Sequence, residues 1–277
     1  MNRKELTLML KEMRSIIREQ VENFPLIRRL ARYEIKSAHA EQRLGLLWEL
    51  LNPGLQIFIY WFVFGVGLKG NKNVDGDIPF IVWLLCGIVV WFFINDALLR
   101  GSNSINSRLA MVTKMRFPMS AIPSYVILSR MYQHFAMLLI VFIVIIANGI
   151  PITWKLLQLP YYMIATYIFV YAFSLCFSTL ITLVKDIQLF LQSMMRMLFY
   201  MTPILWNIER FPDFLHGVLR LNPVFYLVEG YRASLLGGHW VWQEWPTGLY
   251  FWSVTLLLFT AGTFLHIKFR KSFTELV

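Results

Sequence analysis

The sequence predicts an all-α integral membrane protein with six transmembrane helices. Hydrophobic residues make up 57% of the 277-residue chain and charged residues only 15%, well below the ~25% that is usual in soluble domains. Six long apolar runs recur along the chain, each near the ~20 residues that a helix needs to cross a ~30 Å hydrocarbon core. The runs lack the alternation typical of membrane β-barrels, so helices are the expected way to pair their backbone groups.

The six runs define the expected spans and their orientation. They cover Leu50 to Leu68, Ile78 to Leu99, Ala121 to Ala147, Tyr161 to Val184, Ile187 to Trp206 and Gly248 to Ile267. An even number of spans places both termini on one side, and segments on that side hold eighteen Lys and Arg against six on the other. Because basic loops stay in the cytoplasm, we expect both termini there. This asymmetry accounts for much of the formal charge of +10, so no nucleic-acid partner is expected.

The first 49 residues form a separate cytoplasmic arm ahead of a transmembrane domain over residues 50–277. Apolar residues at helical spacing predict two amphipathic helices, separated at Pro25. The second, from Leu26 to about Arg43, is basic and is expected to lie flat on the anionic inner leaflet, although a solvated helix has the same pattern. Its basic residues are Arg28, Arg29, Arg32, Lys36 and Arg43.

The cytoplasmic segment between the second and third spans predicts a short helix from Ser104 to Lys114. Ser and Asn residues supply capping groups, and Pro118 follows the helix. Apolar and basic side chains together suit the groove of a partner protein, but a loop on the surface would look similar. The expected contact residues are Leu109, Met111, Val112, Lys114, Met115, Arg116 and Phe117.

Residues 202–246 are expected outside, where Pro and Gly divide an apolar stretch into pieces too short to span. A capping Asn and a first-turn Pro predict a helix from Pro223 to Leu236, ended by Gly237. We expect a re-entrant or interfacial hairpin over about Pro212 to Leu236, with a globular outer cap as the alternative. The residues expected to fix this hairpin are Asn222, Pro223, Glu229 and Arg232.

Four polar residues on one face of the fifth span are the main candidates for transport chemistry. They are Gln188, Gln192, Arg196 and Tyr200, spaced four apart. A lipid-facing arginine near mid-membrane would cost at least ~3 kcal/mol, so Arg196 should face protein or water. It either lines a translocation path that handles phosphate groups or forms a structural pair with Glu49, Asp96 or a helix carbonyl.

Other ionisable residues lie toward the inner ends of their helices. Asp96, Arg100, Arg130 and His134 are expected to reach the membrane interface by snorkelling.

No catalytic motif is found. The chain has no G-x-x-x-x-G-K-[ST] phosphate loop and no H-E-x-x-H sequence, and its five histidines are scattered. Asp75 and Asp77 are expected in a solvated turn rather than at a metal site. We therefore expect neither catalysis nor a cofactor in this chain.

Several segments resemble signatures of the ABC-2 type polysaccharide-export permeases. They are residues 22–30 (ENFPLIRRL), 33–37 (YEIKS), 44–53 (LGLLWELLNP), 114–118 (KMRFP) and 221–232 (LNPVFYLVEGYR). Within that family, residues 56–65 (QIFIYWFVFG) and 83–87 (WLLCG) are most similar to the teichoic acid translocation permeases.

This resemblance implies a role and partners. Such permeases have an interface helix, a coupling helix after the second span and re-entrant helices before the sixth. A second copy and two separate ABC ATP-binding subunits, which bind ATP and Mg, would complete the transporter in the bacterial cell membrane. The implied substrate is undecaprenyl-diphosphate-linked wall teichoic acid, with O-antigen or capsule as alternatives.

Two other function classes are weaker matches to the sequence. An ion-coupled secondary transporter would usually show internal repeats, and none is detected between the two halves. An intramembrane glycosyltransferase would need an acid/base or metal set that is missing here.

Overall fold

The computed structural model describes residues 3–38, 44–68, 78–109, 118–208 and 212–270, and the regular structure in these ranges is helical. The α-helices are α1 (Arg3–Glu22), α2 (Phe24–Ala38), α3 (Trp48–Tyr60), α4 (Phe80–Ser102), α6 (Ala121–Ala147), α7 (Leu159–Leu183), α8 (Asp186–Met201), α9 (Asp213–Arg220), α10 (Pro223–Leu236) and α11 (Trp245–Phe269). A π-helical segment, Trp61–Leu68, continues α3.

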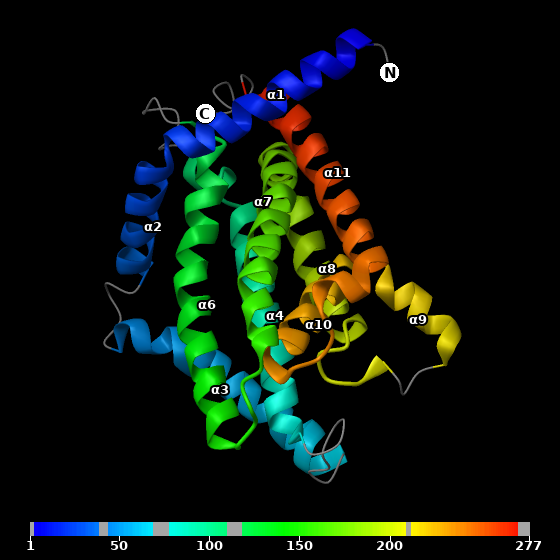
Figure 1. The fold of residues 1–277 in the computed structure, drawn as a ribbon. Helices are drawn as coiled ribbons and strands as arrows, with labels where there is room; N and C mark the ends of the chain where they lie inside the picture. The colour runs from blue at the N-terminus through cyan, green and yellow to red at the C-terminus, as the bar shows by residue number, and fades with distance from the viewer. Residues whose placement is uncertain (1–2, 39–43, 69–77, 110–117, 209–211, 271–277) are drawn as a thin grey trace.

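Helix α4 lies at the centre of the bundle and packs against α6, α7, α8 and α10 (Figure 1). Its first fifteen residues, Phe80–Ile94, are apolar on all sides, and most of its side chains are buried, as expected for a helix surrounded by other helices. Helices α7 and α11 pack along each other and complete the bundle.

Four described segments are long and apolar enough to cross a membrane. They are Phe80–Ser102, Ala121–Ala147, Trp154–Leu183 and Val241–Phe269. Helix α8 is shorter than the apolar run from Ile187 to Trp206, because it ends at Met201 and the chain becomes extended at Thr202, the residue before Pro203, as is usual ahead of a proline. The first apolar run is divided between the 13-residue α3 and the π-helical segment. The described residues thus contain four long candidate spans, and six remains a prediction.

The two N-terminal helices take different directions (Figure 1). Helix α1 lies across one end of the bundle, where it contacts α6 and α11. The side chain of Gln20 donates to the Tyr171 hydroxyl at 2.9 Å and accepts from Ser124 at 2.5 Å. Helix α2 then turns and runs beside α6, burying Ile27 and Ala31. Its depth in a bilayer stays a prediction.

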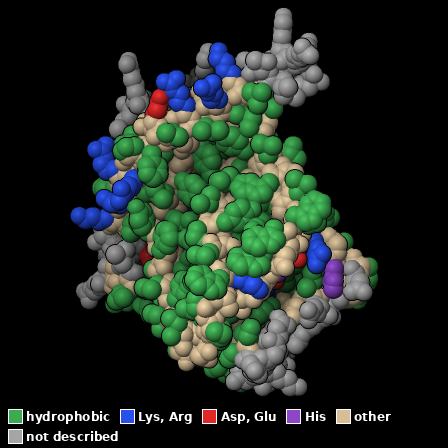
Figure 2. Space-filling model, viewed as in Figure 1, with side chains coloured by type: hydrophobic (Ala, Val, Ile, Leu, Met, Phe, Trp, Pro, Cys, Tyr) green, Lys and Arg blue, Asp and Glu red, His purple; other side chains and the backbone are tan. Residues whose placement is uncertain are grey.

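Hydrophobic side chains cover much of the face in Figure 2, while Lys and Arg gather mainly over α1 and α2. This distribution fits a bundle whose sides contact lipid and whose α1 end contacts water and headgroups.

Helix α10 has the bounds that the sequence predicts, Pro223–Leu236. The side chain of Asn222 accepts a hydrogen bond from the Val224 backbone N–H at 3.0 Å and so caps the first turn. Gly237 ends the helix with φ +78°, a left-handed conformation that glycine adopts without strain. The helix packs on α4 and α7, whereas α9 lies at the edge of the bundle (Figure 1).

Candidate functional site

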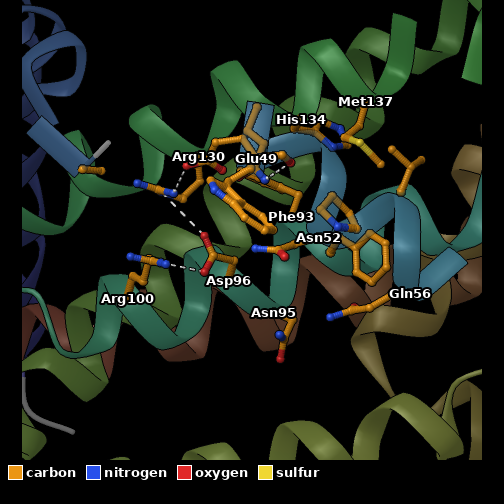
Figure 3. Close-up of a pocket in the computed structure, with 16 residues that line it drawn as sticks. Glu49, Asn52, Gln56, Phe93, Asn95, Asp96, Arg100, Arg130, His134 and Met137 are labelled. Carbon is orange, nitrogen blue, oxygen red and sulfur yellow. Dashed lines mark hydrogen bonds and ion pairs between the residues drawn. The ribbon is translucent and has the colours of Figure 1, made fainter. Parts of the chain in front are cut away.

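A polar cavity of about 440 Å³ lies between α3, α4 and α6 (Figure 3). Its volume falls within the ~300–1,000 Å³ typical of small-molecule sites. Polar side chains line it from all three helices, an unusual feature for a chain that is 57% hydrophobic. The cavity is therefore the main candidate site within the described residues.

An ion-pair network joins the three helices beside this cavity. The Arg130 guanidinium, 5% exposed, lies 3.2 Å from the Glu49 carboxylate and 3.6 Å from the Asp96 carboxylate. Asp96 also accepts a hydrogen bond from Arg100 at 2.6 Å. Figure 3 shows Arg130, Glu49 and Asp96 pointing toward one another from α6, α3 and α4. Opposite charges thus alternate along the series Arg100, Asp96, Arg130 and Glu49, which runs from α4 through α6 to α3.

The Arg130 end of the network lies inside the bundle, whereas Arg100 is 57% exposed. Arg130 is nine residues from Ala121, the first residue of α6, which corresponds to about 14 Å along the helix. Because the Arg130 side chain is 5% exposed, this cation depends mainly on its two carboxylate partners for solvation. The network therefore fixes α3 against α4 and α6 while keeping a polar wall beside the cavity.

These positions correct the snorkelling expectation for two residues. Arg130 and His134 are 5% and 2% exposed, so neither side chain reaches the surface of the chain. The His134 imidazole instead lies 3.0 Å from the Tyr231 hydroxyl of α10. Arg130 and His134 can be buried because α3, α4 and α10 bring partner groups to them on α6. These side chains therefore do not need to extend to the membrane interface.

Neutral amide side chains supply the rest of the polar lining. Asn52 and Gln56 lie one turn apart on α3, and Asn95 lines the cavity from α4. Gln133 of α6 donates a hydrogen bond to the Glu49 backbone carbonyl at 2.9 Å. Sequence reasoning missed these amides. A signal was present, since all four residues interrupt apolar runs.

The four polar residues of α8 are placed outside this cavity. Gln192, Arg196 and Tyr200 are exposed, whereas Gln188 is half-buried and donates to the Leu99 carbonyl at 3.5 Å. Arg196 donates to the Ser193 hydroxyl of its own helix at 3.1 Å. Glu49 and Asp96, considered as its partners, are paired with Arg130 instead.

The basic and coupling residues are only partly described. Arg28, Arg29, Arg32 and Lys36 are exposed on α2, whereas Arg43 lies outside the described residues. Leu109 packs on the cluster formed by α2 and the start of α6. The other contact residues lie outside the described residues as well: Met111, Val112, Lys114, Met115, Arg116 and Phe117.

Arg232 holds α10 in the bundle. Its guanidinium lies 2.7 Å from Glu229, donates to the Ile204 carbonyl at 2.9 Å and stacks over the Trp83 ring at 3.5 Å from the centroid. Gly87 allows this approach, because a Cβ there would lie 2.5 Å from a guanidinium nitrogen. Arg232, 4% exposed, thus has a structural role in the described fold.

Long apolar helices around a polar cavity are typical of an integral membrane protein with a site for a polar ligand. The model of the ABC-2 type transporter family matches residues 25–236, and the chain belongs to this family.

Its relatives include O-antigen export system permease proteins RfbA. The protein from Klebsiella pneumoniae is 26% identical over 89% of this chain and 93% of its own length. The one from Myxococcus xanthus is 25% identical over 79% of this chain and 83% of its own length. The polysialic acid transport protein KpsM of Escherichia coli is 23% identical over 74% of this chain and 79% of its own length.

Proposed function

We propose that this chain is the membrane-spanning subunit of an ATP-driven exporter of a lipid-linked polysaccharide in the bacterial cell membrane. The observation that carries the proposal is the family match over residues 25–236, together with relatives named for O-antigen export and polysialic acid transport. In this role the chain hydrolyses no ATP itself. Separate ATP-binding subunits do so, and they hold ATP and Mg.

The proposed assembly is a homodimer with two ATP-binding subunits. Each copy has six spans and both termini in the cytoplasm, with residues 1–49 as a cytoplasmic arm. The hydrophobic surface in Figure 2 and the basic residues over α1 and α2 support this orientation. The exposed α2 residues Arg28, Arg29, Arg32 and Lys36 are suited to contact anionic headgroups.

The exposed face of α8 is the proposed path for the anionic carrier and polymer. The exposed side chains of Gln192, Arg196 and Tyr200 place hydrogen-bonding groups on this face of α8. A second copy of the chain would bring another such face next to it. A single arginine among neutral groups can attract a phosphate without trapping it, because conduction needs weak sites. Short helices α9 and α10 form the proposed re-entrant hairpin on the outer side.

The polymer is the finer part of the proposal. The resemblance of residues 56–65 and 83–87 favours wall teichoic acid on an undecaprenyl diphosphate carrier. The relatives' names favour O-antigen or capsule as the alternative. Complementation of strains that lack one exporter each would separate these polymers.

The test of the function is assembly with an ATP-binding subunit. We expect the chain to co-purify with a co-expressed ABC ATP-binding subunit and to stimulate its ATP hydrolysis in the presence of carrier lipid. Co-purification and the stimulation of ATP hydrolysis should both be weaker in each of three variants, Leu109→Asp, Lys114→Glu and Arg116→Glu. The reason is that residues 104–117 are proposed to contact the ATP-binding subunit. Asn148→Ala, just beyond the far end of α6, is a control outside the proposed contact. Unchanged assembly and stimulation in all three variants would contradict the coupling role.

A further inference from the structure

We propose that the cavity between α3, α4 and α6 binds the sugar hydroxyls of a lipid-linked saccharide. The inference rests on the proposed function and names the part of the substrate that this chain recognises. It concerns a site separate from the exposed face of α8, because Gln192, Arg196 and Tyr200 do not line the cavity.

The charge balance of the cavity disfavours a phosphate as its ligand. Its lining holds two carboxylates, Glu49 and Asp96, and two guanidiniums, Arg100 and Arg130. Both arginines are paired with these carboxylates. A diphosphate needs cationic donors that are not already compensated, so binding it here would require breaking the network. A neutral polar ligand avoids that cost.

The hydrogen-bonding groups left over are amides. The side chains of Asn52, Gln56 and Asn95 line the cavity, and these side chains make no hydrogen bond to other described residues. Each amide offers two N–H donors and a carbonyl acceptor. A sugar hydroxyl both donates and accepts, so paired amides on α3 and α4 match a ring that carries several hydroxyls. The ion pairs fix α3 and α4 against α6 and so preorganise these amides.

Aromatic side chains give the cavity an apolar wall. Trp48 of α3 and Phe93 of α4 are among its lining residues. The C–H faces of a sugar ring pack well on aromatic rings, while its hydroxyls need polar partners at the edge. A cavity with amides and aromatic rings together therefore suits a saccharide better than an ion or a purely apolar chain.

Helix α3 also separates the cavity from an apolar outer surface. Its other sides expose Leu55, Phe58 and Ile59, each more than half exposed. Such a surface is suited to a hydrocarbon chain, which would remain in the lipid. A substrate with a sugar head and a prenyl tail matches the two faces of α3.

The test compares two probes on the full chain in phospholipid nanodiscs. One is undecaprenyl diphosphate that carries a single N-acetylhexosamine, and the other is undecaprenyl diphosphate without sugar. We expect wild-type protein to bind the sugar-bearing lipid about tenfold more tightly, equivalent to about 1.4 kcal/mol. Asn52→Ala and Asn95→Ala should each reduce this preference about threefold or more and leave binding of the sugar-free lipid unchanged. Asn148→Ala is the matched amide control, and thermal unfolding of each variant checks its fold.

Two results would overturn the inference. One is equal binding of both lipids by the wild type, and the other is an undiminished preference in the Asn52→Ala, Asn95→Ala double variant. ATP-dependent transport of the sugar-bearing lipid by the same wild-type preparation, with its ATP-binding subunit, separates the two failures. If transport is observed but the wild type shows no binding preference for the sugar-bearing lipid, the cavity assignment is wrong and the exporter function is retained. If no transport is observed, the exporter function itself is contradicted.

Discussion

Arg130 and Arg196 lie on two helices that both pack against α4, yet their surroundings are opposite. Arg130 of α6 is 5% exposed and lies within 4 Å of two carboxylates from other helices. Arg196 of α8 is exposed and donates to a hydroxyl one turn away on its own helix. The comparison teaches that position along an apolar run does not decide the role of an arginine. The role of an arginine is instead decided by the groups that neighbouring helices bring to it.

The largest expected effect comes from removing the buried arginine. Arg130→Gln removes the cation that Glu49 and Asp96 share, although Asp96 keeps Arg100, and should destabilise the protein by ~3–5 kcal/mol. Thermal unfolding of the detergent-extracted protein measures this loss. Adding Glu49→Gln to the same chain should restore part of the lost stability, because it neutralises a carboxylate that has lost the Arg130 cation. An Arg130→Gln protein as stable as wild type would show that the network contributes little.

Arg232 should behave as a second buried arginine with a smaller effect. Arg232→Gln loses the stacking on Trp83 and the bonds to Glu229 and Ile204, which should cost ~2–3 kcal/mol. Arg220→Gln, on the exposed end of α9, is the control and should change stability by less than ~0.5 kcal/mol. Equal midpoints for the two variants in thermal unfolding would contradict the structural role of Arg232.

The basic residues of α2 should act on membrane contact rather than on folding. Near an anionic leaflet each of Arg28, Arg29 and Arg32 is worth ~1 kcal/mol. Spin labels placed along α2 should report immersion with a period of 3.6 residues, and the Arg28→Gln, Arg32→Gln double variant should shift that profile toward water. Uniform exposure to water in the wild type would contradict a membrane role for this helix.

The smallest change in stability is expected for Arg196→Gln, within ~0.5 kcal/mol, because the side chain is exposed and strands no carboxylate. Transport should nevertheless fall several-fold, since the path would lose its cation, while basal ATP hydrolysis persists. A strongly destabilised variant would instead place Arg196 in a structural pair. Measured beside Arg130→Gln, this variant tests the contrast between the two arginines on one scale.

Local signals made part of the fold predictable. The bounds of α10 follow from Asn222, Pro223 and Gly237, whose effects act within a turn of the helix end. The end of α8 was harder to predict from the sequence, because the apolar composition continues to Trp206 although the helix ends at Met201. Composition predicts burial in lipid, but it does not mark where a helix ends before a proline.

The cavity could not be predicted in the same way. Glu49 and Arg130 are 81 residues apart in sequence, and only the packing of α3 on α6 brings them together. The sequence identified Glu49 and Asp96 as possible partners of an arginine, but it considered them only for Arg196, as one of two alternatives. Choosing between arginines on different helices requires knowledge of which helices are neighbours, and that is set by packing over the whole bundle.

The measurement that tests the exporter function most directly is transport by reconstituted vesicles. The chain and its ATP-binding subunit would be placed in liposomes with a lipid-linked polysaccharide, and the polymer that reaches the opposite leaflet would be labelled by an impermeant reagent. The account predicts labelling that requires ATP and both subunits and that falls in the Arg196→Gln variant. Transport by the chain alone, driven by a sodium or proton gradient without ATP, would contradict it and identify a secondary transporter.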